Sequence, residues 1–308
     1  AQVDEPTTPV QRTVANLQVL AALLESPKRS DAELMLRYTG WGGLSIEDIK
    51  DRIPSALLPD GKALLHEYYT PSVVAQDIAR LVAPWVVGLP TQDGKVLALE
   101  PSAGIGRLVN AFSVSGFERV SWTAIEYSRL SSALLGRVRP DIQVLSSSFE
   151  EWFVSVGSRA RGRFGLVISN PPYGQRGSEA AIDPDTDHKD TRAYVYFMRR
   201  CLELLAEGGI GVFIIPYGFM SATTPYFENL RSRILREAHL RVAFRLPSNL
   251  FPGAQIVTDL VILESRGGLL DEVLPEDVEI AKGRYYEAFP THILGEEKGK
   301  TRDEDEYR

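Results

Sequence analysis

Apolar residues recur three or four positions apart near the N-terminus, a spacing typical of an amphipathic helix. Between positions 12 and 25 the residues that follow it are Val14, Leu17, Leu20, Ala21 and Leu24. Asp31 is a residue type that caps helices, and it predicts a second helix that runs through Tyr38. The first ten residues are polar, which predicts a loose end. We therefore expect a helical leader over residues 1–65.

Two features connect this leader to the rest of the chain. Residues 37–44 place three glycines around Trp41, which predicts a tight turn, and we interpret Trp41 as a packing residue between helices rather than a ligand contact. Further along, Thr70 is predicted to cap a helix in which Pro71 takes the first position. The apolar face of that helix comprises Val73, Val74, Ile78, Leu81 and Val82.

From Lys95 onward, short apolar runs alternate with amphipathic helical stretches, and this alternation predicts an α/β fold. Strands are expected at 96–99, 122–125, 142–145, 166–169, 210–216, 240–246 and 256–264. Helices are expected from position 107 and at 193–205 and 227–237. Gly208 and Gly209 are expected to form a break between the helix at 193–205 and the fifth strand. We predict a doubly wound, mostly parallel seven-stranded sheet with one antiparallel strand at 256–264.

Composition narrows the class of protein. With 308 residues, 44% hydrophobic and 24% charged, the chain resembles an ordinary soluble globular protein with ample core. No apolar run approaches the roughly 20 residues of a membrane span, so no membrane association is expected. The single cysteine, Cys201, excludes an internal disulfide and favours a reducing, cytoplasmic setting. One cysteine and four histidines offer no metal-ligand spacing, so no metal is expected.

Negative charge is concentrated at the C-terminal end. The net charge is −7, and residues 271–308 hold twelve acidic and six basic side chains, a net of −6. The preceding part is therefore close to neutral and can still carry a local basic groove. We expect a folded domain over 66–268 and an acidic extension over 269–308.

The most informative stretch is Asn170-Pro171-Pro172-Tyr173, which follows the apolar run 164–168. It lies where open α/β sheets bind ligands, at the C-terminal end of a strand. The amide oxygen of Asn170 and the carbonyl of Pro171 are expected to be free acceptors, and Tyr173 adds a flat face. Such a set suits a planar group with an exocyclic amine. The same residues also suit a strand that simply ends in a Pro-Pro turn.

A small-residue turn at 100–106 follows the first strand of the sheet, and Glu126 ends the second. The turn contains neither the Gly-x-Gly-x-x-Gly pattern nor the Lys-Ser/Thr pair of phosphate-binding loops. A nucleoside ligand without phosphates fits better, because Gly104 and Gly106 permit close backbone approach and Glu126 can accept from two ribose hydroxyls.

Taken in order, these motifs resemble those of S-adenosylmethionine-dependent DNA adenine (N6) methyltransferases of the gamma class. The resemblance covers roughly residues 66–265 and rests on Thr70-Pro71, the turn 100–106, Glu126, Phe149 and the stretch 170–173. It implies a Rossmann-like methyltransferase sheet, with S-adenosylmethionine as the cofactor and DNA as the substrate. The stretch 37–44 is similar to the leader of methylase modules in large phage and plasmid methylase–helicase proteins.

The resemblance also implies a role for each motif residue. The cofactor-binding residues would be Tyr69, Thr70, Pro71, Glu100, Pro101, Ser102, Ala103, Gly104, Gly106, Glu126, Ser148, Phe149 and Asn170. Among them Glu126 would bind the ribose, Phe149 would pack on the adenine ring, and residues 69–71 would border the methionine part. The catalytic residues would be Asn170, Pro171, Pro172 and Tyr173. Tyr173 would stack on a flipped target adenine, and Phe251 would form the second wall of that slot.

Two departures from the family bear on partners. Ser148 stands where the family often has an acid, and a serine accepts a hydrogen bond more weakly than a carboxylate does. Only about forty residues follow the last strand, too few for a recognition domain. We therefore expect an additional recognition or helicase domain or subunit, as in restriction, anti-restriction or phage-defence proteins. The alternatives are a methyltransferase of RNA adenine or release-factor glutamine, or a degenerate, non-catalytic DNA-binding module.

Residues 174–192, directly after Tyr173, are polar, net acidic and long for a loop. Two interpretations remain open from the sequence. The segment is either a solvated, disordered insertion or a mobile lid that orders over the flipped base when nucleic acid arrives.

Overall fold

The structure is a computed structural model that describes residues 5–25, 31–51, 55, 58, 67–114 and 118–295. Some residues of the expected leader and of the expected acidic extension lie outside these described ranges. His66, the first residue of the expected folded domain, also lies outside them. The described strands are β1 Val96–Glu100, β2 Val120–Glu126, β3 Gln143–Ser146, β4 Phe164–Ser169, β5 Leu205–Pro216, β6 Ala238–Leu246 and β7 Thr258–Ser265.

The strands form one seven-stranded sheet in the order β3-β2-β1-β4-β5-β7-β6. The pairs from β3 to β5 are parallel, whereas β7 is antiparallel to both β5 and β6. This confirms the expected doubly wound sheet and its antiparallel strand. The strand order reverses between β1 and β4, so the turns after these two strands meet at the switch point where such sheets bind ligands.

One strand differs from the prediction, because Gly208 and Gly209 lie within β5 and do not precede it. The strand begins at Leu205, which pairs with Phe164, and the next pair joins Ile210 to Leu166. The residues between them bulge out of the ladder, and Gly208 takes a positive φ of 73° that only glycine adopts readily.

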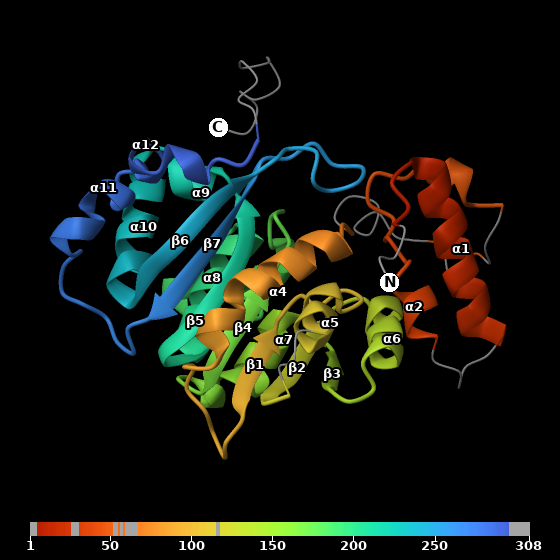
Figure 1. The fold of residues 1–308 in the computed structure, drawn as a ribbon, viewed down its shortest axis with the longest axis horizontal. Helices are drawn as coiled ribbons and strands as arrows, with labels where there is room; N and C mark the ends of the chain where they lie inside the picture. Colours follow the sequence, from red (N-terminus) through yellow and green to blue (C-terminus); the bar gives the residue numbers. More distant parts are fainter. Residues whose placement is uncertain are drawn as a thin grey trace.

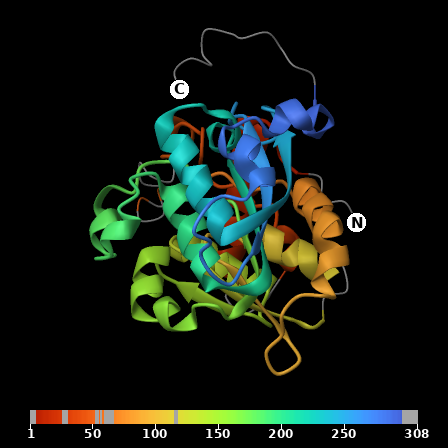
Figure 2. The same cartoon turned by 90° about the vertical axis from the view of Figure 1, so that its left-hand side faces the viewer.

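Helices cover both faces of the sheet (Figures 1 and 2). On one face, α4 and α5 pack with alternate residues of β5 that include Ile210, Val212 and Ile214. On the other face, α7, α8 and α10 pack with Phe213 and Ile215. The main helices are α4 Ser72–Val86, α5 Arg107–Val114, α6 Arg129–Val138, α7 Phe149–Ser155, α8 Ala193–Leu204 and α10 Pro225–Glu237; shorter ones are α9 Gly218–Ser221, α11 Val278–Ala281 and α12 Tyr285–Ala288.

The leader packs on α6, at the side of the molecule where α1 and α2 lie (Figure 1). It contains α1 Pro9–Glu25, α2 Ala32–Met35 and the short turn η1 Ile46–Asp48. Asp31 caps α2 as predicted, through a 3.0 Å hydrogen bond from the Leu34 amide. However, α2 ends before Tyr38, because the chain turns at Gly40 with a φ of +72°. Trp41 is 2% exposed and packs edge-on against Tyr38, which confirms its packing role.

The buried face of α1 contains polar as well as apolar residues. Val14 and Leu24, which belong to its apolar spacing, are 43% and 58% exposed. Arg12 and Asn16 are instead buried, and both donate side-chain hydrogen bonds to the carbonyl of Gly40. Polar residues face inward here because the leader's turn leaves backbone groups that need partners.

The C-terminal residues pack on the sheet as far as they are described. Tyr285 and Tyr286 join the core beneath α10 and β6, and the Leu294 amide donates to the Arg245 carbonyl at the outer edge of β6. The domain boundaries at 65 and 268 stay predictions. Within the described part of the chain, no helix is both long and apolar enough to cross a membrane.

Candidate active site

The turns after β1 and β4 lie side by side, because these two strands are neighbours in the sheet. The hydroxyl of Ser102 is 2.9 Å from that of Ser169 and donates to the backbone carbonyl of Asn170 at 3.1 Å. The structure thus brings together the small-residue turn at 100–106 and the stretch 170–173.

The side-chain amide of Asn170 is held at both ends. Its nitrogen donates to the hydroxyl of Thr70 at 3.2 Å, and its oxygen accepts from the hydroxyl of Tyr173 at 2.7 Å. The Tyr173 hydroxyl oxygen also lies 3.2 Å from the carbonyl oxygen of Ile214, which is the more distant of its two acceptors. The expectation of a free acceptor on Asn170 is therefore wrong for this state of the protein.

Tyr173 and Phe251, the two proposed walls of the base slot, have different surroundings. Tyr173 packs against the core on the α8 side, and burial raises the pKa of its hydroxyl, which is therefore a neutral donor. Phe251 is 3% exposed and packs with the core on the α4 side. That they stack on a base together stays a prediction.

Thr70 does not cap a helix. The α4 helix begins at Ser72, and Pro71 occupies the capping position without a side-chain hydrogen bond. The predicted cap is wrong because the Thr70 hydroxyl instead accepts from Asn170. The backbone carbonyl of Thr70 accepts from Arg107, a residue that sequence analysis did not single out. The sequence feature that could have identified Arg107 is its position, because a charged residue directly follows Gly106 at the start of an otherwise apolar helix.

On the cofactor side, Gly104 and Gly106 adopt positive φ angles of 54° and 81°. The carboxylate of Glu126 accepts from the amides of Gly104 and Ser128, each at 2.7 Å. Burial raises the pKa of Glu126 to about 7, although these two hydrogen bonds act in the opposite direction. The structure thus places Glu126 against the glycine turn, and that it binds the ribose of a cofactor stays a prediction.

Glu100 is a second buried carboxyl group at this position. It is 2% exposed, and burial raises its pKa well above the ordinary value. One of its side-chain oxygens has no hydrogen-bond partner among the residues that the structure describes. Glu100 lines a narrow pocket together with Tyr69, Thr70, Ser102 and Asn170. A buried carboxyl group with a raised pKa ionises more readily when a cation lies beside it, so Glu100 suits a cationic group of a ligand.

Glu67 is the third buried carboxyl group, and sequence analysis missed it. Burial raises its pKa, and its carboxylate accepts from the Tyr69 hydroxyl at 2.6 Å and from the Trp41 amide at 3.1 Å. The ring of Tyr69 packs on Gly104 so closely that a Cβ atom there would lie 2.5 Å from it. Glu67 therefore ties the leader's glycine–tryptophan turn to the cofactor side of the site.

These residues fit S-adenosylmethionine in chemistry. The partnerless oxygen of Glu100 suits its positive charge, Glu126 suits its ribose, and the glycine turn admits a close backbone approach. The free volume of the pocket is only about 20 Å³, little more than one water molecule requires. Side chains such as Tyr69 must therefore move when the cofactor enters.

Ser148 and Phe149 lie at the start of α7, away from this pocket. The Ser148 hydroxyl accepts from the Glu151 amide, and the Glu151 carboxylate accepts from the Ser148 amide, which makes a capping box. Phe149 is 2% exposed and its ring lies 4.7 Å from that of Phe197. Their assignment to the cofactor's adenine stays a prediction.

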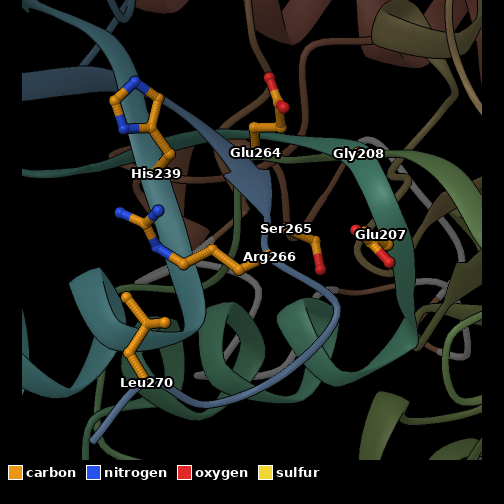
Figure 3. Close-up of a pocket in the computed structure, with 7 residues that line it drawn as sticks. All are labelled: Glu207, Gly208, His239, Glu264, Ser265, Arg266 and Leu270. Atoms are coloured by element: carbon orange, nitrogen blue, oxygen red, sulfur yellow. The ribbon is translucent and has the colours of Figure 1, made fainter. Parts of the chain in front are cut away.

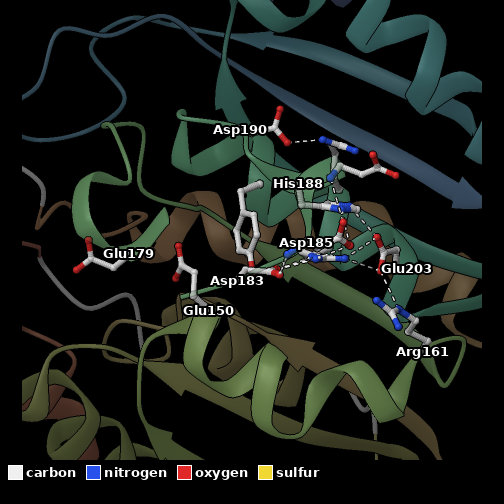
Figure 4. Close-up of polar contacts among 12 residues, drawn as sticks. Glu150, Arg161, Glu179, Asp183, Asp185, His188, Asp190 and Glu203 are labelled. Carbon is white, nitrogen blue, oxygen red and sulfur yellow. Dashed lines mark hydrogen bonds and ion pairs between the residues drawn. The ribbon is translucent and has the colours of Figure 1, made fainter. Parts of the chain in front are cut away.

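The segment 174–192 is fastened down by buried ion pairs (Figure 4). The side chain of Arg176 is 1% exposed; it pairs with Glu150 at 3.1 Å and lies 3.6 Å above the Tyr196 ring. Asp183 pairs with Arg200 of α8 at 2.6 Å, and His188 pairs with Glu203 at 2.7 Å. The expected solvated insertion and the expected mobile lid both fail to match this arrangement.

A larger hollow of about 700 Å³ lies at the opposite end of the sheet, between Glu207, His239, Glu264 and Arg266 (Figure 3). It borders the start of β5, whereas the motif residues follow the C-terminal ends of β1 and β4, so it is not the candidate site. Among the residues that the structure describes, no group of three or more His, Cys, Asp or Glu side chains could hold a metal ion.

Comparison with known proteins points to one family. Residues 124–251 match the model of the Eco57I restriction-modification methylase family. The type II methyltransferase M.BsuBI of Bacillus subtilis is 23% identical over 262 residues, which cover 75% of this chain and 49% of that protein. The modification methylase CviBIII of Paramecium bursaria Chlorella virus NC1A is 27% identical over 140 residues, which cover 44% of this chain and 34% of that protein.

The fold has a solved counterpart. A protein of Listeria monocytogenes described as a class I S-adenosylmethionine-dependent methyltransferase matches with a TM-score of 0.54 and 16% identity, covering 86% of this chain and 92% of that one. The chain spans about half the length of the first curated relative and a third of the second. Over residues 124–251 the chain is thus similar to restriction–modification methylases, and its sheet has the Rossmann-like fold of the S-adenosylmethionine-dependent methyltransferases.

Proposed function

We propose that this chain transfers a methyl group from S-adenosylmethionine to the exocyclic amine of adenine in DNA. The observation that carries the proposal is the position of Asn170, whose amide borders the pocket that Glu100 lines. The amide oxygen of Asn170 and the carbonyl of Pro171 are two acceptors on one turn. An exocyclic amine has two hydrogens to donate, so this pair matches it.

The chemistry needs little from the protein beyond orientation. The cofactor, when bound, supplies an electrophilic methyl group. Asn170 and the Pro171 carbonyl would accept hydrogen bonds from the two amine hydrogens, which raises electron density on the nitrogen and directs its lone pair toward the cofactor pocket. In the transfer a C–N bond would replace the methyl–sulfur bond, S-adenosylhomocysteine would leave, and the amine would lose one proton to solvent. Positioning and fixed dipoles then supply most of the rate. Glu126 holds the ribose and Glu100 offsets the positive charge of the cofactor.

Adenine in a duplex does not reach Asn170, so the target base leaves the stack and Tyr173 packs on it. For that, the Tyr173 ring leaves its packed position, so its hydroxyl gives up the hydrogen bond to Asn170. Tyr173 therefore exchanges a hydrogen bond for a stacking contact when the base arrives.

Sequence recognition is assigned to another domain or subunit. The chain covers 49% of the length of M.BsuBI, and the described residues after β7 pack on the sheet. A larger restriction, anti-restriction or phage-defence protein would supply the missing recognition or helicase part.

Methyl transfer to parallel substrates tests the proposal. The purified chain is incubated with tritium-labelled S-adenosylmethionine and DNA, RNA or release factor, and the labelled DNA is digested for nucleoside mass spectrometry. The expected product is N6-methyladenine from DNA. Label confined to RNA, to release factor or to cytosine would overturn the proposed substrate. Absence of cofactor binding by calorimetry would indicate the non-catalytic alternative.

A further inference from the structure

Among the described residues, the nitrogen of the Asn170 side chain has one partner, which comes from far away in the sequence. Asn170 donates to the Thr70 hydroxyl at 3.2 Å across 100 positions, and Thr70 is 4% exposed. Asparagine's two amide ends have similar shapes but opposite hydrogen-bonding character. The Thr70 contact on the nitrogen, together with the Tyr173 hydroxyl on the oxygen, therefore restricts the rotation of the amide.

We propose that Thr70 is a positioning residue for Asn170, holding its amide so that the oxygen is presented to the target amine. The inference rests on the proposed function and adds a role that cofactor binding does not require. The terminal torsion of asparagine has a broad energy profile, so a side chain without this contact samples several orientations. The oxygen would then meet the amine for only part of the time.

Thr70 is itself braced by Arg107, which makes it a rigid support. Arg107 is 7% exposed and donates to the Thr70 carbonyl at 3.3 Å. Its other terminal nitrogen donates to the carbonyls of Leu36 and Tyr38, each at 3.0 Å. A continuous set of hydrogen bonds thus runs from the leader through Arg107 and Thr70 to Asn170.

This path gives the leader a role in catalysis. Leu36 and Tyr38 offer their backbone carbonyls because α2 ends at Met35 and the chain then turns. The Leu36 carbonyl at the end of α2 lacks a partner within the helix, and Arg107 satisfies it together with the Tyr38 carbonyl two residues further on. The leader is therefore a brace for the catalytic amide as well as a cover for α6.

A role in cofactor binding alone predicts a different outcome from positioning. A threonine that only borders the methionine part of the cofactor contributes to affinity, so its loss raises the dissociation constant. A positioning threonine leaves that constant unchanged and lowers kcat at saturating cofactor and DNA. Measuring the cofactor's dissociation constant and kcat in the same variant therefore distinguishes the two roles.

The test is Thr70→Val, which keeps the shape of the side chain and removes its hydroxyl. We expect kcat to fall about tenfold, since one orienting hydrogen bond is lost at the reacting centre. The dissociation constant of S-adenosylmethionine should stay within about twofold, and Thr70→Ser should restore most of the rate. The matched control is Thr123→Val, because the Thr123 hydroxyl bonds only to Gln143 on the neighbouring strand.

A second measurement reads the contact without any activity. The side-chain amide signal of Asn170, assigned by its loss in Asn170→Ala, is followed by NMR in the cofactor-free chain. Its hydrogen exchange should speed up about tenfold in Thr70→Val and return to the wild-type rate in Thr70→Ser. Unchanged exchange in Thr70→Val, or a rise in the cofactor's dissociation constant with unchanged kcat, would overturn the proposal. If the wild-type chain methylates no DNA, the proposed function fails, and the exchange measurement still decides the Thr70 contact.

Discussion

The hydroxyl of Tyr173 lies 2.7 Å from the amide oxygen of Asn170, within the same four-residue turn. That oxygen is the acceptor that we propose for the target amine. A catalytic group and the residue expected to stack on the substrate therefore satisfy each other while no base is present. Such an arrangement protects a buried polar atom from remaining unpaired, which would cost about 1–3 kcal/mol.

Replacing Tyr173 with Phe tests this relationship. The ring remains for stacking, but the hydroxyl no longer competes for Asn170. We expect Tyr173→Phe to bind target DNA a few fold more tightly, as measured by fluorescence anisotropy, and to lose about 1 kcal/mol of free energy of unfolding without DNA. Weaker DNA binding by the Phe variant would show that the hydroxyl assists the base rather than competing with it.

Asn170→Ala removes the acceptor itself. We expect a loss of more than about 10² in kcat, because one oriented polar group at the reacting nitrogen disappears. Cofactor affinity, measured by calorimetry, should change little, since the amide is assigned to the substrate. Near wild-type transfer in this variant would refute the mechanism, and a matching loss of cofactor affinity would move Asn170 to the cofactor's side.

Cofactor affinity should depend on pH through Glu126. Its pKa is raised to about 7, so the carboxyl is mostly protonated at pH 6 and mostly ionised at pH 8. The ionised form accepts from ribose hydroxyls more strongly, so the dissociation constant of S-adenosylmethionine should fall as pH rises from 6 to 8. Isothermal titration across this range checks the trend, and Glu126→Gln should flatten the part of it that comes from Glu126.

The same group makes stability depend on pH with the opposite sign. The folded state holds the Glu126 proton more tightly than the unfolded chain, whose carboxyl has a pKa of about 4.3. The free energy of unfolding therefore decreases as pH rises from about 4.3 to about 7. We expect Glu126→Gln to raise Tm relative to the wild type by a few degrees at pH 8 and not at pH 4.5. An equal change in Tm at both pH values would mean that the change comes from packing and not from the ionisation of Glu126.

The buried ion pairs of the segment 174–192 should dominate its stability. Arg176→Met leaves Glu150 buried without its cation, which we expect to cost about 3–5 kcal/mol in urea unfolding. The matched control is Arg80→Met, which breaks an exposed pair with Asp77 and should cost less than about 1 kcal/mol. Equal effects of the two changes would mean that the segment is not fastened by its buried charges.

Sequence alone determined the type of sheet and the location of its chemistry. The alternation of short apolar runs with helical stretches from Lys95 onward depends on local periodicity, and it predicted the strands and the antiparallel β7. Asn170 and Glu126 each end such a run, so their positions at the edge of the sheet followed from the pattern. The Asp31 cap also followed, because capping involves residues only three positions apart.

Tertiary structure decided what each polar group pairs with. Thr70 was predicted as a cap because Thr-Pro commonly begins a helix, but its hydroxyl meets Asn170 from 100 positions away. The same holds for Asp183 and Arg200, whose pairing turned a polar loop into a fastened segment. It holds again for Arg12 and Asn16, which are buried on α1 because both bond the Gly40 carbonyl. The spacing of apolar residues indicates which face of a helix or strand is buried on average. A buried donor or acceptor instead bonds to whichever partner the fold brings within about 3 Å, and that partner can lie anywhere in the sequence.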